Sequence, residues 1–176
     1  MTTKMRMVLS LLVCLVVQTV RGEQADIVIN EFLASNQGQI KDPVFSKFSD
    51  WIELHNTTDR DIDLSGYYLT DNLDEPVMWR IPSGTLIPKA GYLVFWADGQ
   101  DVGLHTDFRL NRVGEQLGLY SPDRIVVDAL SFGTQQDDMS FGRLENSETQ
   151  WVVFDLPTPG RANDASHAVD VTPSPL

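Results

Sequence analysis

Cysteine and basic residues are scarce in this sequence. Of its 176 residues one is a cysteine, Cys14, and 13 are Lys or Arg against 25 Asp or Glu, so the formal net charge at pH 7 is -12. A single cysteine excludes an intramolecular disulfide framework and the cysteine-rich zinc motifs. An acidic chain repels phosphate backbones, because nucleic-acid affinity comes largely from Lys and Arg neutralising phosphates. We therefore expect no nucleic-acid partner.

Long hydrophobic runs are also missing, except at the N-terminus. Lys4 and Arg6 precede an apolar run over residues 7–17, and a Val-Arg-Gly sequence follows at 20–22. This order is typical of a signal peptide at residues 1–22, cleaved before Glu23. The run is shorter than the roughly 20 residues that span a membrane, so we expect no stable span after cleavage; a retained N-terminal anchor is the alternative. The expected location is secreted, either extracellular or at the cell surface.

Motifs for catalysis are missing as well. The sequence has no Gly-x-Ser-x-Gly, no His-Glu-x-x-His and no glycine-rich phosphate loop. Its three histidines, His55, His105 and His167, lie far apart along the chain. We therefore predict that the protein is not an enzyme and has no catalytic residues. A hydrolase whose residues meet only in the fold is the alternative.

Short apolar runs separated by Gly, Pro, Asn, Asp and Ser are present instead. From Asp26 onward such runs recur every 8 to 12 residues or so, and no stretch of a dozen residues has a helical stripe. Strands are expected near residues 27–33, 51–56, 64–70, 78–82, 85–86, 92–97, 116–120, 125–131, 140–143 and 150–154. This pattern predicts an all-β sandwich or barrel.

Alternation within one strand predicts which side chains are buried. In residues 51–56, Ile52 and Leu54 share one face while Trp51, Glu53 and His55 share the other, which predicts a half-buried strand with a polar outer side. All four tryptophans fall in expected strands, so we expect them in or at the edge of the core. A sugar-stacking platform, tested best at Trp51 and Trp79, is the alternative.

Two segments fall outside this strand pattern. Residues 35–49 form a long loop, with Gly38 and Pro43, and loops of this length are either functional or tolerated insertions; both interpretations stay open. Residues 164–176 have no apolar periodicity and end in Thr-Pro-Ser-Pro-Leu. We expect this segment to be a disordered C-terminal tail.

Acidic turns raise the question of calcium. Residues 59–63 have Asp-x-Asp-x-Asp spacing, but Leu64 stands where an EF-hand loop needs Gly. Residues 71–75 form a second acidic turn. The calcium candidates are Asp59, Asp61, Asp71 and Asp74. Solvated turns in which Asp bonds its own backbone are the alternative, and we expect no other cofactor.

Several blocks together resemble the lamin tail domain family as it occurs in exported bacterial proteins. They include, in order, INEFLASN at 29–36, DWIELHN at 50–56, IDLSGYYLTD at 62–71, AGYLVFWAD at 90–98, SFGR at 140–143 and PTPGRAN at 157–163. The resemblance implies an immunoglobulin-like β-sandwich over residues 23–163, used as a binding or scaffolding module. It supplies no catalytic residues, and no heptads precede the domain, so filament assembly is not supported.

The expected function is that of a secreted, non-catalytic interaction or scaffolding module. Its partner would be an extracellular protein or a polysaccharide, outside the cell or at its surface. A calcium-dependent binding module and a hydrolase with an unrecognised site are the alternatives. The sequence identifies no binding residues, because the residues that define the sandwich are mostly those that fill its core. A binding surface is expected in the loops and acidic turns between the strands.

Overall fold

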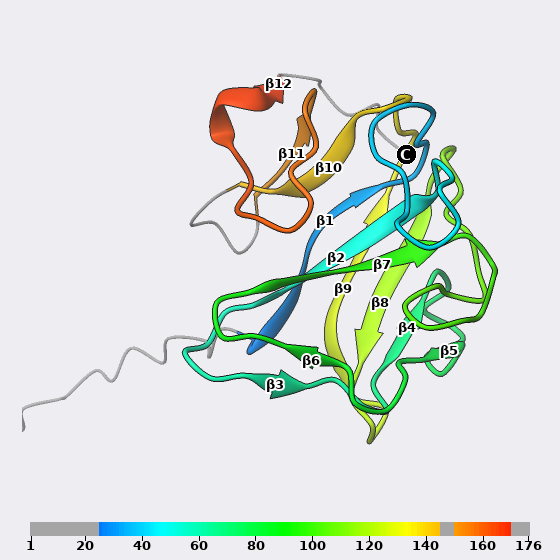
Figure 1. Cartoon of the computed structure of the whole chain (residues 1–176), viewed down its shortest axis with the longest axis vertical. Coiled ribbons are helices and arrows are strands. Elements are labelled where there is room, and N and C mark those ends of the chain that lie inside the picture. The colour runs from blue at the N-terminus through cyan, green and yellow to red at the C-terminus, as the bar shows by residue number, and fades with distance from the viewer. Residues whose placement is uncertain (1–24, 145–149, 170–176) are drawn as a thin grey trace, which may run out of the picture.

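A computed structural model describes residues 25–144 and 150–169, which form antiparallel β-sheets (Figure 1). The expected signal peptide at 1–22 lies outside the described residues. Each expected strand overlaps an observed one, and the all-β fold is confirmed. The strands are β1 Ile27–Leu33, β2 Asp50–Asn56, β3 Ile62–Asp63, β4 Tyr68–Thr70, β5 Trp79–Arg80, β6 Leu86–Ile87, β7 Tyr92–Ala97, β8 Glu115–Tyr120, β9 Val126–Phe132, β10 Ser140–Arg143, β11 Trp151–Phe154 and β12 Ala168–Val169.

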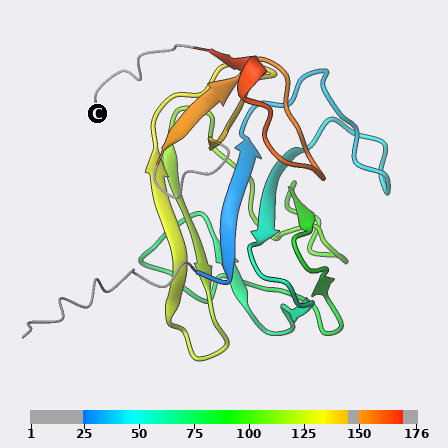
Figure 2. The same cartoon turned by 90° about the vertical axis from the view of Figure 1, so that its left-hand side faces the viewer.

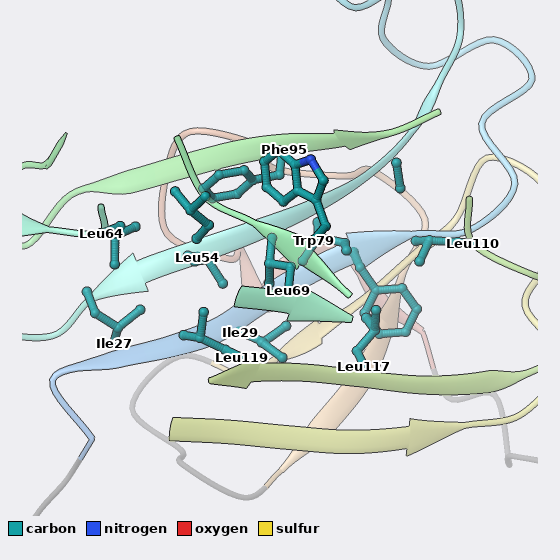
Figure 3. Packing of buried hydrophobic residues seen from close by; sticks show 14 of the residues in the cluster. Ile27, Ile29, Leu54, Leu64, Leu69, Trp79, Phe95, Leu110, Leu117 and Leu119 are labelled. Carbon is teal, nitrogen blue, oxygen red and sulfur yellow. The ribbon is translucent and has the colours of Figure 1, made fainter. Parts of the chain in front are cut away.

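Two sheets enclose the core. The larger has the order β12-β11-β10-β1-β2-β7, and the smaller has the order β5-β4-β8-β9; β3 and β6 pair separately. Alternate side chains of each sheet point inward, as pleated strands require. Figure 3 shows Ile29, Leu54 and Phe95 of the larger sheet packing with Leu69 and Leu119 of the smaller. The result is an immunoglobulin-like β-sandwich.

An ion pair links β9, an edge strand of the smaller sheet, to the larger sheet. Strand β9 runs beside β1 (Figure 2), and the Asp128 carboxylate accepts the Ile29 backbone N–H at 2.8 Å. Arg143 on β10 donates to both oxygens of Asp128, at 2.7 and 2.9 Å. A charged side chain turned inward in this way blunts a strand edge that could otherwise pair with another chain.

Strand β2 is buried on both faces, which corrects the expectation of a polar outer side. Trp51 and Glu53 are both 0% exposed. Trp51 packs with Leu33 and Trp96, and Glu53 accepts hydrogen bonds from the Asn30 side chain and the Gly160 backbone N–H. The outer face is therefore covered by chain that is distant in sequence. Alternation alone does not reveal such a cover.

Residues 157–163, which we call the C-terminal strap, provide that cover over β1 and β2. The Thr158 backbone N–H and hydroxyl donate to the buried carboxylate of Glu31, the hydroxyl at 3.0 Å. Asn163 accepts from the Asn30 side chain at 3.0 Å and donates to the Arg143 carbonyl at 2.7 Å. These bonds satisfy polar groups that would otherwise be buried without partners.

The chain stays ordered beyond the strap, which corrects part of the expected disordered tail. Residues 165–167 form the short 3-10 helix η1 (Ala165–His167), and β12 then pairs with β11. Asp164 caps η1 by accepting the Ser166 backbone N–H at 2.9 Å. The backbone pairing of β12 with β11 and the Asp164 cap hold this segment in place although it has no apolar periodicity. Residues 170–176 lie outside the described part.

The tryptophans behave largely as expected of core residues. Trp51, Trp79 and Trp96 are buried, and Trp151 is half-buried against Phe141, with ring centroids 5.4 Å apart. Trp79 lies at 4% exposure, and its ring nitrogen donates to Asp101 at 3.0 Å. Neither Trp51 nor Trp79 presents a ring face to solvent, so neither forms a sugar-stacking platform.

Candidate binding pocket at the β1–β2 loop

An open pocket of about 330 Å³ lies where the loop between β1 and β2 meets the segment that follows β7. Both segments lie at the same end of the larger sheet (Figure 1), because β1 and β7 each run toward it while β2 runs away. Most of the lining is polar. The lining residues are Asn36, Gln37, Lys47, Phe48, Ser49, Asp50, Ala97, Asp98, Gln100 and Arg109.

The β1–β2 loop is held in shape by its own side chains. The buried Asn36 amide donates to the carbonyl groups of Ile40 and Ser49, at 2.7 and 2.8 Å. The buried Asp42 carboxylate accepts the backbone N–H groups of residues 44, 45 and 47. The Asn36 amide takes the place of a backbone donor and the Asp42 carboxylate that of a backbone acceptor, which is how Asn and Asp stabilise turns. The first wall of the pocket is therefore preformed.

A second brace comes from the loop between β9 and β10. The Ser35 hydroxyl donates to Asp137 at 2.6 Å, and the backbone N–H groups of Gln37 and Gly38 donate to Asp138 at 2.7 and 2.8 Å. Arg112 pairs with Asp137 at 2.8 Å. The contacts of residues 35, 37 and 38 join segments about 100 positions apart in sequence and fix the base of the β1–β2 loop, while Arg112 holds Asp137 in place.

The second wall is built around Asp98, directly after β7. Its carboxylate accepts from the Gln100 backbone N–H at 3.2 Å and lies 3.0 Å from Nδ1 of the buried His105. The Ser49 hydroxyl also donates to Asp98, at 3.3 Å, and so links the two walls. Gly99, whose φ of 73° favours glycine, leaves room for Arg109, because a Cβ there would lie 3.2 Å from Nε of that side chain.

The charges in the pocket are balanced. Asp50 accepts the Asn36 backbone N–H at 2.9 Å through one oxygen, and burial raises the pKa of its carboxyl to about 6 despite that bond and the charge of Arg109. Lys47 and Arg109 supply two positive charges, and neither forms an ion pair within the described residues. Asp50 and Asp98 supply two negative charges. The pocket therefore offers both donors and acceptors with little net charge.

Ser49, Asp98 and His105 are in contact, but not in the order that nucleophilic catalysis requires. A serine nucleophile passes its proton to an imidazole, and a carboxylate orients that imidazole. Here the Ser49 hydroxyl and the imidazole both bond to Asp98, and Nε2 of His105 is buried without a partner in the described chain. His105 is also packed edge-on against Phe45, with ring centroids 4.9 Å apart. This arrangement holds the wall of the pocket.

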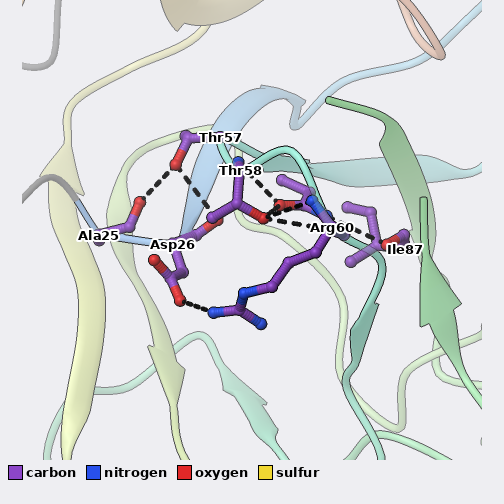
Figure 4. A network of polar contacts seen from close by, with 7 residues as sticks. Ala25, Asp26, Thr57, Thr58, Arg60 and Ile87 are labelled. Atoms are coloured by element: carbon purple, nitrogen blue, oxygen red, sulfur yellow. Dashed lines mark hydrogen bonds and ion pairs between the residues drawn. The ribbon is translucent and has the colours of Figure 1, made fainter. Parts of the chain in front are cut away.

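The calcium candidates lie in two separate turns. Asp59 and Asp61 are exposed on the turn between β2 and β3. In this turn the side chains of Asn56 and Thr58 donate to the Arg60 carbonyl. The Arg60 guanidinium pairs with Asp26 (Figure 4). Asp61 accepts the Lys89 backbone N–H at 2.9 Å.

Asp71 and Asp74 follow β4. Burial raises the pKa of Asp71, and the Asp74 backbone N–H donates to the Asn72 side chain at 3.0 Å. Among residues 25–144 and 150–169, no group of three or more His, Cys, Asp or Glu side chains is placed to hold a metal ion. In the same part of the chain no helix is long and apolar enough to cross a membrane.

The sandwich fold and the preformed pocket are those of a small immunoglobulin-like binding domain. The family model described as Lamin Tail Domain matches residues 21–134, and the chain belongs to this family of non-enzymatic, immunoglobulin-like interaction domains. A search of curated proteins finds no match. Every residue that lines the pocket lies inside the matched segment, whereas β10, β11 and the C-terminal strap lie beyond it.

Proposed function

We propose that this protein is a secreted, non-catalytic interaction module that binds a protein or polysaccharide outside the cell or at its surface. The observation that carries the proposal is the open, preformed pocket in which Lys47 and Arg109 have no ion-pair partner among the described residues. Polar groups converging on a concave site are typical of ligand recognition. A loop braced from three sides would bind with little ordering cost.

The sequence supports export of this module. The basic start, the short apolar run and the Val-Arg-Gly sequence at 20–22 have the order of a secretory signal. The strongly acidic composition favours solubility and disfavours nucleic acid. Cell fractionation of an epitope-tagged protein tests this part: recovery outside the cytoplasm is expected, and recovery only in the cytoplasm would contradict export.

Binding can be tested by retention of the purified protein on cell envelopes and on matrix polysaccharides. We expect the wild type to be retained and the pocket variant Lys47→Ala/Arg109→Ala to lose at least about tenfold in affinity, which is about 1.4 kcal/mol. The matched control is Arg80→Ala/Lys89→Ala, which removes the same charge from exposed positions outside the pocket. Retention should survive chelation of calcium; loss on chelation would favour the calcium-dependent alternative.

Two results would count against the proposal. Absence of wild-type retention on every envelope and matrix fraction would remove the binding function. Equal loss in the pocket variant and in the control variant would show that charge, and not the pocket, governs retention.

A further inference from the structure

We infer that the pocket recognises a neutral saccharide, whose hydroxyls donate hydrogen bonds to Asp50 and accept them from Arg109, and whose ring makes an apolar contact with Phe48. This inference rests on the proposed binding function and names the chemical class of the ligand. Three features of the pocket carry it: its balanced charge, its mixture of available donors and acceptors, and an exposed aromatic ring at its rim.

Balanced charge favours a neutral ligand. Two acidic and two basic side chains line the pocket, while the chain as a whole carries a net charge of -12. An acidic polymer would meet no net positive charge in the pocket and would be repelled by the rest of the molecule. A neutral ligand avoids that repulsion, and its affinity should depend little on salt.

Available donors and acceptors lie together in the pocket. Among the described residues Asp50 accepts one hydrogen bond, at Oδ1, which leaves Oδ2 as an acceptor. Arg109 lines the same pocket, and its guanidinium makes no hydrogen bond or ion pair within residues 25–144 and 150–169. A sugar hydroxyl both donates and accepts, so neighbouring hydroxyls on one ring could bond to Asp50 and Arg109 together. Charged partners make such bonds stronger than bonds between neutral groups.

Phe48 supplies an apolar surface beside these polar groups. It is 41% exposed, and the Lys41 ammonium lies 5.1 Å from its ring centroid. The neighbouring Val44 and Phe45 are 64% and 37% exposed. Of these three side chains, Phe48 lines the pocket, and the C–H groups of a sugar ring suit an aromatic surface. A volume of about 330 Å³ is at the small end of ligand pockets, which fits one or two rings rather than a long chain segment.

The inference can be tested by calorimetric or NMR titration with neutral oligosaccharides of two to four units, built from glucose, galactose, mannose or xylose. Uronic-acid oligosaccharides of the same length are the acidic comparison. We expect at least one neutral series to bind, with an affinity that changes less than about twofold between 20 and 200 mM salt. We expect each uronic-acid oligosaccharide to bind more weakly.

Variants assign the contacts. Asp50→Asn and Phe48→Leu should each weaken binding at least fivefold, whereas Phe48→Tyr should retain it because the aromatic ring is kept. The control Arg80→Ala/Lys89→Ala should bind as the wild type does. A thermal melt of each variant confirms folding. If Phe48→Leu does not fold, Arg109→Ala gives a further test, because removal of the donor should weaken binding at least fivefold and unchanged binding would overturn the inference.

The outcomes separate the two proposals. Tighter binding of uronic acids than of neutral sugars would overturn the inference. Retention on envelopes without binding to any saccharide would also overturn it and would point to a protein partner, while the proposed function would stand. Absence of both retention and saccharide binding would overturn the proposed function as well.

Discussion

The buried carboxyl of Glu53 should make the protein less stable as the pH rises. Glu53 is 0% exposed, and burial raises the pKa of its carboxyl from 4.5 to about 8, with a smaller contribution from the neighbouring Glu31. Because its folded pKa lies above its unfolded pKa, the folded state binds the proton more tightly. The contribution of the protonated Glu53 carboxyl to the free energy of unfolding is fully present below about pH 4.5 and is lost as the pH rises through about 8.

The magnitude follows from the shift. A rise from 4.5 to about 8 corresponds to about 5 kcal/mol, at about 1.4 kcal/mol per pKa unit. Burial also raises the pKa of Glu31, so its effect has the same sign. Glu53→Gln removes the ionisable group, and we expect it to reduce the pH dependence of the unfolding free energy between pH 5 and 8 without abolishing it. Glu115 and Asp50, whose pKa values burial raises to about 7 and about 6, contribute with the same sign in this range. The two Glu53 oxygens accept from Asn30 and Gly160, whereas glutamine has one accepting oxygen and its amide nitrogen is a donor, so one N–H group loses its acceptor. The variant should therefore lose about 1–3 kcal/mol at pH 5.

Urea unfolding at pH 5, 6, 7 and 8, followed by tryptophan fluorescence, measures these quantities. Three buried tryptophans provide the signal. Asp123→Asn, at an exposed position on the turn before β9, is the control for removal of one carboxylate. An unchanged pH dependence in Glu53→Gln would refute the reasoning, as would a wild type whose stability rises from pH 5 to pH 8.

Two further predictions concern the strap and the pocket. Gly142→Ala should lower stability by about 1–3 kcal/mol, because its Cβ would lie 2.7 Å from Nδ2 of Asn163 and push the strap away; an unchanged melting temperature by circular dichroism would contradict this packing. Saccharide binding should weaken as the pH falls through about 6, because Asp50 then takes up a proton and stops acting as a charged acceptor. Titrations at pH 5 and 7 check this, and Asp50→Asn should remove the dependence.

The strands could be predicted because local pattern and final structure agree. The expected bounds of 27–33, 92–97 and 140–143 are those of β1, β7 and β10. Apolar alternation and flanking turn residues are local properties, so one sequence is enough to reveal them. The two-residue strands β3 and β12 were not predicted as separate strands, since such short pairs depend on the partner strand that lies beside them.

The outer face of β2 could not be predicted, for a related reason. Glu53 looks like a surface residue in an alternating strand, but its partners are Asn30 and Gly160, which are 23 and 107 residues away. A sequence does not show which distant segment will cover a sheet. The PTPGRAN block at 157–163 was visible as part of the resemblance, but its role as a strap required the fold.

The pocket was only partly predictable. The loop at 35–49 was expected to be either functional or a tolerated insertion, and its internal bonds to Asn36 and Asp42 show why it holds one shape. The meeting of Asp50 with the end of β7 follows from the antiparallel register, in which Asp50 lies opposite Ala97. That register is a tertiary property. The calcium candidates share a local Asp spacing, and local spacing does not determine which carboxylates converge in the fold.

The most direct test of ligand recognition by the pocket is an NMR titration of isotope-labelled protein with the neutral oligosaccharide that binds best. We expect the largest amide shifts on residues 36–50 and 97–109, and we expect Arg109→Ala to abolish them. Largest shifts on the opposite end of the sandwich, such as the turn at 121–125, would contradict it, as would shifts that persist unchanged in Arg109→Ala.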